Sequence, residues 1–282
     1  MSREAPGAHI EIRRARVSFT RADGSNVSAL SGIDLDIERG EFVCIIGRSG
    51  EGKTTLLNAV AGLVPLSAGE VLTNGRPVTR PGADRGVVFQ DDSVFPWMRV
   101  LANVEFGLRI RGVPRQRRRD IAMEHLRLVD LEGVAHSWPK ELSGGMRARV
   151  AVAAVFANDP EVLLADEPFG SLDYVTRRRL QDVILELWER THKTVLFVTH
   201  DVEEALVLAS RVVVVSHGQV VEDCAIHLDR PRTEAVLASA EAVAIRTLVL
   251  EHLGIIQHPT RTGDGLLSSA GHDRSVGRSP HE

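Results

Sequence analysis

Short apolar runs alternate with amphipathic stretches along most of the chain. Unbroken apolar runs are typical of strands that are buried on both faces. They occur at 42–46, 86–89, 162–165, 195–198 and 212–215. Apolar positions at helical spacing occur at 54–61, 147–158 and 176–191. Strands that alternate with helices indicate an α/β fold with a mostly parallel core sheet.

The N-terminal part follows a different pattern. Apolar and polar residues alternate at 10–19, which predicts an edge strand or one arm of a hairpin. A turn-forming segment at 22–26 and a second alternating stretch at 30–37 come next. We therefore expect an antiparallel β subdomain ahead of the first buried strand.

Two regions are predicted to be helical. From about residue 91 to residue 141 no strand-like run appears, and with the helical pattern that follows, this predicts an inserted subdomain at about 91–158. Residues 234–253 predict a further helical segment. The first region carries an arginine cluster, interpreted as a solvated helix face rather than a nucleic-acid patch. The cluster consists of Arg115, Arg117, Arg118 and Arg119.

Composition narrows the class of protein. A length of 282 residues suits one α/β domain with an appendage, and a hydrophobic share of 43% allows a substantial core. The net charge of -4 argues against bulk electrostatic binding to nucleic acid. No apolar stretch approaches the roughly 20 residues of a membrane span, and the first residues show no secretory signal. We therefore expect a soluble cytosolic protein that reaches a membrane only by docking on another protein.

The segment 47–55 combines a glycine-rich turn with one of the few lysines. It satisfies the pattern Gly, four residues, Gly-Lys-Ser/Thr, between a predicted strand and a predicted helix. Glycines let successive backbone N–H groups point at phosphate oxygens, and the helix N-terminus adds its positive dipole. Lys53 is expected to reach the β- and γ-phosphates, and the Thr54 hydroxyl to bind Mg²⁺. The predicted nucleotide-binding residues are Gly47, Arg48, Ser49, Gly50, Glu51, Gly52, Lys53, Thr54 and Thr55.

Polar residues end three of the predicted strands. Asp166, at the end of 162–165, is expected to face the phosphate loop and to hold Mg²⁺ directly or through water. The adjacent Glu167 can polarise a water for attack on the γ-phosphate. Gln90 and His200 follow two other strands. Taken alone, His200 is more simply interpreted as a structural hydrogen-bonding group.

One more motif, Leu142-Ser143-Gly144-Gly145-Met146, opens a helix before the acidic strand. With the phosphate loop, Gln90, Asp166-Glu167, Ser171-Leu172-Asp173 and His200, it resembles the ATP-binding-cassette (ABC) family over about residues 10–225. The motifs stand in the order that this family shows. The resemblance implies a P-loop NTPase cassette with a mostly parallel core sheet, an N-terminal antiparallel β subdomain and an inserted helical subdomain.

The resemblance also implies a division of the chain. An N-terminal extension, 1–9, precedes an ATPase domain at 10–230, into which the helical subdomain, about 91–158, is inserted. A C-terminal helical extension, 231–258, follows. The composition of 259–282, rich in Gly, Ser, His and Arg, predicts a disordered tail.

In this family two cassettes close head to tail around two ATP molecules. Each phosphate loop then meets the partner's signature segment, Leu142, Ser143, Gly144, Gly145 and Met146. The resemblance implies Glu167 as general base, His200 on the γ-phosphate and Asp173 at the dimer seam. Lys53 and Gln90 complete the catalytic set. Thr54, Gln90 and Asp166 are the implied Mg²⁺ ligands.

A narrower resemblance is to the nitrate/sulfonate/taurine importer group. It is carried by 95–98, 100–104, 166–173, 200–205 and 230–232. It implies the ATP-hydrolysing subunit of an ABC importer, peripheral on the cytoplasmic face of the cell membrane, that drives uptake of a small oxyanion. The implied partners are a second copy, membrane-spanning permease subunits and, indirectly, an extracytoplasmic solute-binding protein, with no nucleic acid. Aromatic residues beside Gln90 suit a groove for a permease coupling helix, or ordinary packing of the helical subdomain.

Two positions depart from the family pattern. Arg21 stands where members usually carry the aromatic residue that stacks on adenine, and Phe19 lies two residues away. Either the guanidinium plane of Arg21 or the ring of Phe19 can take this role. Met146 replaces a commoner glutamine, a change that the importer group tolerates.

Two other functions compete with transport. A soluble ABC ATPase acting on ribosomes or DNA usually has two cassettes in one chain or a long coiled-coil insertion, and this sequence shows neither. A nucleotide-gated regulatory module without turnover is the other alternative. The intact set of Lys53, Asp166, Glu167 and His200 argues against it.

Overall fold

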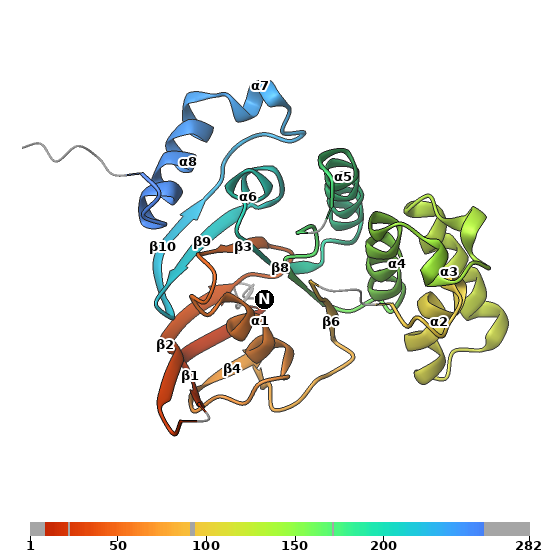
Figure 1. Ribbon diagram of the computed structural model, residues 1–282, viewed down its shortest axis with the longest axis horizontal. Helices are drawn as coiled ribbons and strands as arrows, with labels where there is room; N and C mark the ends of the chain where they lie inside the picture. The colour runs from red at the N-terminus through yellow and green to blue at the C-terminus, as the bar shows by residue number, and fades with distance from the viewer. Residues whose placement is uncertain (1–8, 22, 91–93, 171, 257–282) are drawn as a thin grey trace, which may run out of the picture.

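The computed structural model describes residues 9–21, 23–90, 94–170 and 172–256, which form two sheets and the helices that cover them (Figure 1). The strands are β1 Ile10–Thr20, β2 Asn26–Ile37, β3 Phe42–Ile46, β4 Ala68–Thr73, β5 Arg76–Pro77, β6 Arg85–Val88, β7 Val162–Asp166, β8 Thr194–Thr199, β9 Arg211–Ser216 and β10 Gln219–Ala225. The α-helices are α1 Lys53–Ala61, α2 Val100–Ile110, α3 Arg115–Leu128, α4 Gly144–Ala157, α5 Tyr174–Thr191, α6 Val202–Leu208, α7 Glu234–Leu237 and α8 Ala240–His252. Short 3-10 helices span Glu132–Val134 and Pro139–Glu141.

The larger sheet confirms the mostly parallel core. Its strand order is β10-β9-β3-β8-β7-β6, and only the edge strand β10 is antiparallel to its neighbour. The register pairs Ile46 with Thr199 and Asp166 with Val198, so β3, β7 and β8 end at nearly the same level. The loops after these strands therefore emerge side by side, at the edge where open parallel sheets bind ligands.

The smaller sheet confirms the antiparallel N-terminal subdomain. Of the two alternatives for 10–19, the hairpin is correct, because β1 pairs with β2 along its length. An edge position for β1 is wrong, since β4 pairs with its other side. The strand β4 lacks an apolar run because its first three residues are exposed and only Val71 and Thr73 are buried. It therefore left little signal in the sequence.

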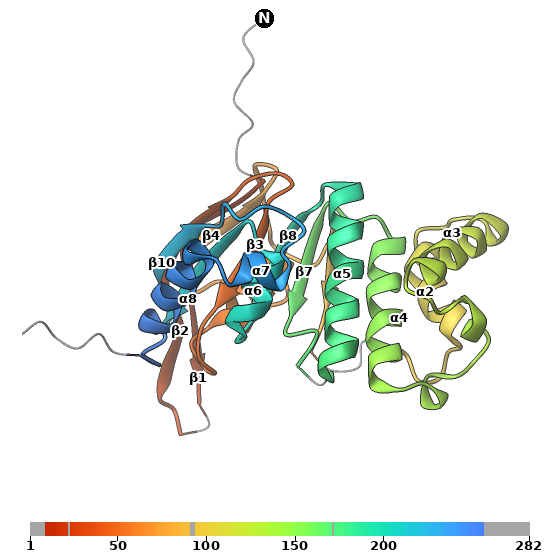
Figure 2. The same ribbon diagram turned by 90° about the horizontal axis from the view of Figure 1, so that it is seen from above.

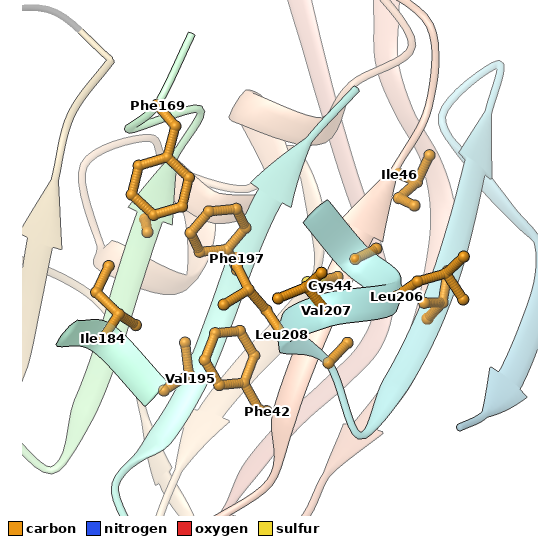
Figure 3. Close-up of a cluster of buried hydrophobic side chains, with 14 of the residues drawn as sticks. Phe42, Cys44, Ile46, Phe169, Ile184, Val195, Phe197, Leu206, Val207 and Leu208 are labelled. Carbon is orange, nitrogen blue, oxygen red and sulfur yellow. The ribbon is translucent and has the colours of Figure 1, made fainter. Parts of the chain in front are cut away.

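Alternate residues of β3 enter different cores. Phe42 and Cys44 pack with α5 and α6 on one face, whereas Val43 and Ile45 pack with α1 and the smaller sheet on the other. Figure 3 shows the first face, where the Phe197 ring contacts two other rings. Cys44 is fully buried, as its place in an apolar run predicts, and burial raises the pKa of its thiol well above the usual value.

The helices α2, α3 and α4 lie together at one end of the molecule (Figure 2), and a separate apolar cluster holds them to one another. Its buried side chains include Val104 from α2, Leu126 from α3 and Val150 from α4. The arginine cluster lies on α3, where Arg115, Arg117 and Arg119 are exposed. The arrangement agrees with a solvated helix face.

The helical pattern at 234–253 forms two helices rather than one. Ser239 separates them and caps α8, because its hydroxyl accepts the Ala242 N–H at 3.2 Å. Val249 anchors α8 in the main core. The predicted extension 1–9, apart from His9, and the predicted tail 259–282 lie outside the described residues. Within the described chain, no helix is both long enough and apolar enough for a membrane span.

Candidate functional site

Glycine is required at two positions of the phosphate loop. A Cβ on Gly47 would lie 2.4 Å from the Val215 carbonyl oxygen, and a Cβ on Gly52 would lie 2.3 Å from that of Ala29. Gly52 also has a φ of 99°, which side chains rarely adopt. At these two glycines the loop therefore passes close to the backbone of both sheets before it enters the N-terminus of α1. The free N–H groups of that helix end form a ready site for phosphate.

Lys53 lies beneath the loop with 5% of its surface exposed. Its Nζ donates hydrogen bonds to the carbonyl oxygens of Gly47, at 2.8 Å, and Arg48, at 3.0 Å. The same Nζ lies 3.8 Å from Oε1 of Glu167. The lysine is therefore held at the floor of the loop, with its charge directed toward the end of β7.

Asp166 and Thr54 form an oxygen-donor pair. Thr54 Oγ1 donates to Asp166 Oδ1 at 3.0 Å, and Asp166 is 6% exposed. Burial raises the pKa of the Asp166 carboxyl, and Glu167 adds to the shift, whereas the Thr54 hydrogen bond and Lys53 oppose it. A divalent cation would relieve this unfavourable burial of charge. The pair therefore fits Mg²⁺.

Across the described residues, no group of three or more His, Cys, Asp or Glu side chains could hold a metal ion. Mg²⁺ needs no such cage, because one or two carboxylates and the substrate's phosphates usually suffice. Thr54, Asp166 and Gln90 are the residues that would hold it.

Glu167 occupies a strained backbone position above the loop. Its φ of 42° lies in the left-handed region, which costs a non-glycine residue about 1 kcal/mol or more. The Glu167 N–H donates to the Val198 carbonyl at 3.0 Å, which ties this turn to β8. Its Oε2 lies 2.8 Å from Nδ1 of His200, an exposed side chain. The carboxylate is thus aimed between Lys53 and His200.

A cavity of about 260 Å³ brings most of the predicted nucleotide-site residues together. Gln90 and Glu167 line its far wall. From the phosphate loop, the lining residues are Ser49, Gly50, Gly52, Lys53, Thr54 and Thr55. Arg48 and Glu51 instead line a neighbouring cavity, where Glu51 accepts a hydrogen bond from the backbone N–H of His217.

The signature segment lies elsewhere. None of Leu142, Ser143, Gly144, Gly145 and Met146, all of them described, lines this cavity. Ser143 caps α4, its hydroxyl accepting the Met146 N–H at 3.3 Å, and Ser143 and Gly144 are exposed. One chain therefore does not bring its own signature to its own phosphate loop.

Asp173 serves a local structural purpose in the single chain. It caps α5 by accepting the backbone N–H of Thr176 at 3.0 Å and the Thr176 hydroxyl at 2.7 Å, and these hydrogen bonds lower the pKa of its carboxyl. It is nevertheless exposed, so its outer face is open to a partner. Ser171, its companion in the motif, lies outside the described residues.

The two adenine candidates lie at the end of the β1 hairpin. Phe19 is 46% exposed and pairs with Val27, two residues from Ala29, which lines the cavity. Arg21 is exposed, and its N–H donates to the Ser25 carbonyl in the turn. Neither side chain lines the cavity itself.

Sequence reasoning missed two parts of this region. Ala29 belongs to the smaller sheet, and no local pattern marked it. The second is a polar network of Arg177, Asp201 and Glu204 behind His200. Its only signal was the acidic residues that follow the histidine in the sequence.

The fold and this cavity define a P-loop nucleotide-binding cassette. The family model described as ABC transporter matches residues 30–170. A taurine import ATP-binding protein of Rhizobium johnstonii is 49% identical over 73% of this chain and 79% of its own length. A nitrate import ATP-binding protein of Synechocystis is 49% identical over 74% of this chain and 78% of its own. The chain belongs to the ABC transporter family.

A solved structure agrees with this assignment. A dimeric post-hydrolysis state of an ATP-binding cassette bound to ADP and phosphate superposes with a TM-score of 0.70 at 31% identity. It covers 77% of this chain, which in turn covers 98% of it. The chain is therefore an ATP-binding cassette ATPase, and ATP is its nucleotide.

Proposed function

We propose that this chain is the ATP-hydrolysing subunit of an importer for a small oxyanion such as nitrate, a sulfonate or taurine. The observation that carries the hydrolytic part is the Glu167 carboxylate, held 2.8 Å from His200 and 3.8 Å from Lys53 above a phosphate loop. Import and the substrate class are supported by the import proteins that resemble the chain at 49% identity.

Hydrolysis follows from the placement of these groups. Lys53 and the N–H groups at the α1 N-terminus bind the phosphates, and Mg²⁺, when bound, neutralises their charge. Glu167 accepts a proton from the water that attacks the γ-phosphate. His200, hydrogen-bonded to Glu167, would orient that carboxylate and contact the γ-phosphate.

A second copy completes the site. The cavity is open, and the signature residues that would close it lie on another part of the same chain. In a head-to-tail pair, the partner's exposed Ser143 and the N-terminus of α4 would meet the γ-phosphate, because a helix N-terminus favours anions. Asp173 would lie at the seam. Closure of the pair then depends on bound ATP, so that hydrolysis is linked to the opening of the two cassettes.

A second cavity suits a permease. It has a volume of about 390 Å³ and lies between the loop before β6 and the helices α2 and α4. Phe95, Phe106 and Ile110 line it, and Ile110 is 72% exposed. An amphipathic helix of a permease subunit fits an apolar groove of this kind. The chain would then work at the cytoplasmic face of the membrane, served by an extracytoplasmic solute-binding protein.

The experiment that tests transport is recovery of the tagged full chain from native membranes. The wild type is expected to retain a polytopic membrane protein at about equal stoichiometry. Ile110→Asp is expected to lower that recovery about 10-fold, because a charge is placed in the apolar contact. The ATPase rate of the purified variant should stay at the wild-type value.

Val221→Asp is the matched control. Val221 is 42% exposed on β10, remote from the groove, so this variant should retain the membrane protein. Equal losses from both variants would contradict the groove assignment. Recovery of only ribosomal or DNA-repair proteins, from the soluble fraction, would contradict transport and leave the ATPase standing.

Phe19 is the proposed adenine platform. Its ring is exposed beside the strand that supplies Ala29, whereas the backbone of Arg21 closes the hairpin turn. Phe19→Ala is expected to weaken ATP binding about 10-fold, because stacking on a base is worth about 1–3 kcal/mol. Fluorescent-nucleotide titration of Phe19→Ala and Arg21→Ala decides between the two. A larger loss in Arg21→Ala would reverse the assignment.

A further inference from the structure

Arg177, in the first turn of α5, joins two segments, the one that ends at Asp173 and the N-terminus of α6. Its Nη2 donates to the carbonyl oxygen of Leu172 at 3.3 Å, directly before the proposed seam residue Asp173. Its Nη1 donates to Asp201 Oδ2 at 3.1 Å, directly after His200. Its Nε lies 3.6 Å from Glu204 Oε1 on α6. One planar guanidinium therefore contacts the segments that carry the seam residue and the histidine.

The groups on the far side of Arg177 fix the residues that flank His200. Thr199 Oγ1 donates to Glu204 Oε2 at 2.6 Å and accepts the Asp201 N–H at 3.0 Å. Glu204 is 5% exposed. The Thr199 hydroxyl thus links the Glu204 carboxylate to the Asp201 backbone N–H across His200. The carboxylates of Glu204 and Asp201 both face Arg177. His200 in turn contacts Glu167.

One contact of Arg177 is incomplete. Within the described residues its buried Nε has no hydrogen-bond partner, and Glu204 stands just beyond hydrogen-bonding distance. A buried unpaired N–H costs free energy, so a movement of a few tenths of an ångström that closes this gap would be favourable. A shift of the Leu172 carbonyl, to which Arg177 is hydrogen-bonded, would change the distance between Nε and Glu204.

We propose that Arg177 is a positioning residue that couples the dimer seam to His200. The proposal rests on the proposed function, because it assumes a head-to-tail pair and a role for His200 in hydrolysis. When a partner docks against residues 172–173, this seam segment shifts Arg177. Arg177 then positions the carboxylates of Asp201 and Glu204. These two residues then hold His200 in the orientation that supports Glu167. Completion of the site by the second copy is thereby signalled to the catalytic carboxylate within the same chain.

Arginine suits this position better than lysine. The coupling needs donors directed at a carbonyl and two carboxylates at once, and a guanidinium presents them in a rigid planar fork. Lysine has one ammonium group and can satisfy part of the set. We therefore expect the kcat of Arg177→Lys for ATP hydrolysis to lie between those of the wild type and Arg177→Gln.

The test is a double-mutant cycle on the purified full chain, read by steady-state ATP hydrolysis. Arg177→Gln is expected to lower kcat about 10- to 100-fold, as a displaced catalytic group would, with KM for ATP changed less than about twofold. His200→Ala is expected to lower kcat at least as much. In the His200→Ala background, Arg177→Gln should change kcat less than about twofold, because the residue through which it acts is already absent.

Arg178→Gln is the matched control. Arg178 is the next residue on α5, and among the described residues its hydrogen-bond partner is Gln181, at 3.4 Å. Its removal should leave kcat within about twofold of the wild type. If Arg177→Gln does not fold, Arg177→Lys takes its place in the cycle. Its smaller effect on kcat should likewise disappear in the His200→Ala background.

The outcomes separate the coupling from the function on which it rests. If the fold-losses in kcat of the two single variants multiply in the double variant, the two residues act independently and the proposal for Arg177 is overturned. Hydrolysis itself would still depend on His200. A wild-type rate in His200→Ala would overturn the role of His200 in the proposed function. A rise in KM with unchanged kcat in Arg177→Gln would show that Arg177 supports nucleotide binding only, which also overturns the coupling.

Discussion

Glu167→Gln is expected to lower the ATP turnover number about 100- to 1,000-fold, while ATP affinity stays within about twofold of the wild type. Glutamine keeps the shape and the hydrogen-bonding capacity of the side chain, yet it cannot accept the proton of the attacking water. In the proposed site the phosphates contact Lys53 and the loop rather than this group, so binding should survive. Phosphate release and fluorescent-nucleotide titration measure the two quantities separately.

Glu167→Gln should also trap the closed pair. In the proposed pair, ATP that binds without being hydrolysed would hold the two cassettes together, so size-exclusion chromatography with light scattering should show an ATP-dependent dimer. Glu186→Gln is the matched control, because Glu186 lies on the exposed side of α5 and pairs with Arg190. It should hydrolyse ATP like the wild type. Equal turnover by the wild type and Glu167→Gln would contradict the general-base role and favour a nucleotide-gated module.

The phosphate loop could be predicted from the sequence because its determinants are contiguous. An apolar strand, a glycine turn and a helix start follow one another within 42–61, so spacing alone defines the site. Asp166 and Glu167 were predictable for a related reason. A buried parallel strand must end at the ligand-binding edge of the sheet, and polar residues placed there face the same region.

Contacts between segments that are distant in the sequence were harder to predict. Spacing along the chain cannot reveal that β7 and β8 are neighbours, and the approach of His200 to Glu167 depends on that pairing. The contact of Ala29 with Gly52 depends likewise on how the two sheets meet. Arg177 lay within an arginine-rich helix start, where nothing in the pattern distinguished it from Arg178.

Strands with polar faces were also difficult to predict. β10 alternates exposed and half-buried residues at the edge of the larger sheet, and β4 buries only two side chains. Neither presents an apolar run, because each has at least one face in water. Their places in the sheets follow from pairing with β9 and β1, which the sequence pattern does not encode.

The greatest loss of nucleotide binding is expected from Lys53→Ala. ATP affinity should fall about 100-fold, equivalent to about 2.7 kcal/mol, as expected for hydrogen bonds from a charged donor. Hydrolysis at saturating ATP should fall as well, because in the proposed mechanism Lys53 stabilises charge on the transferred phosphate. Titration with a fluorescent nucleotide and phosphate release at several ATP concentrations separate the two losses.

Because the chain has few lysines, the effect of Lys53→Ala can be compared directly with that of a charge-matched lysine outside the cavity. Lys140 is exposed beside the signature segment and lies outside the nucleotide cavity, so Lys140→Ala is a charge-matched control that should bind ATP normally. Lys53 itself is held by the carbonyls of Gly47 and Arg48, so its removal frees two acceptors within the loop. Thermal unfolding without nucleotide therefore distinguishes loss of phosphate binding from collapse of the loop. Wild-type affinity in Lys53→Ala would mean that the backbone N–H groups and the α1 N-terminus alone hold the phosphates.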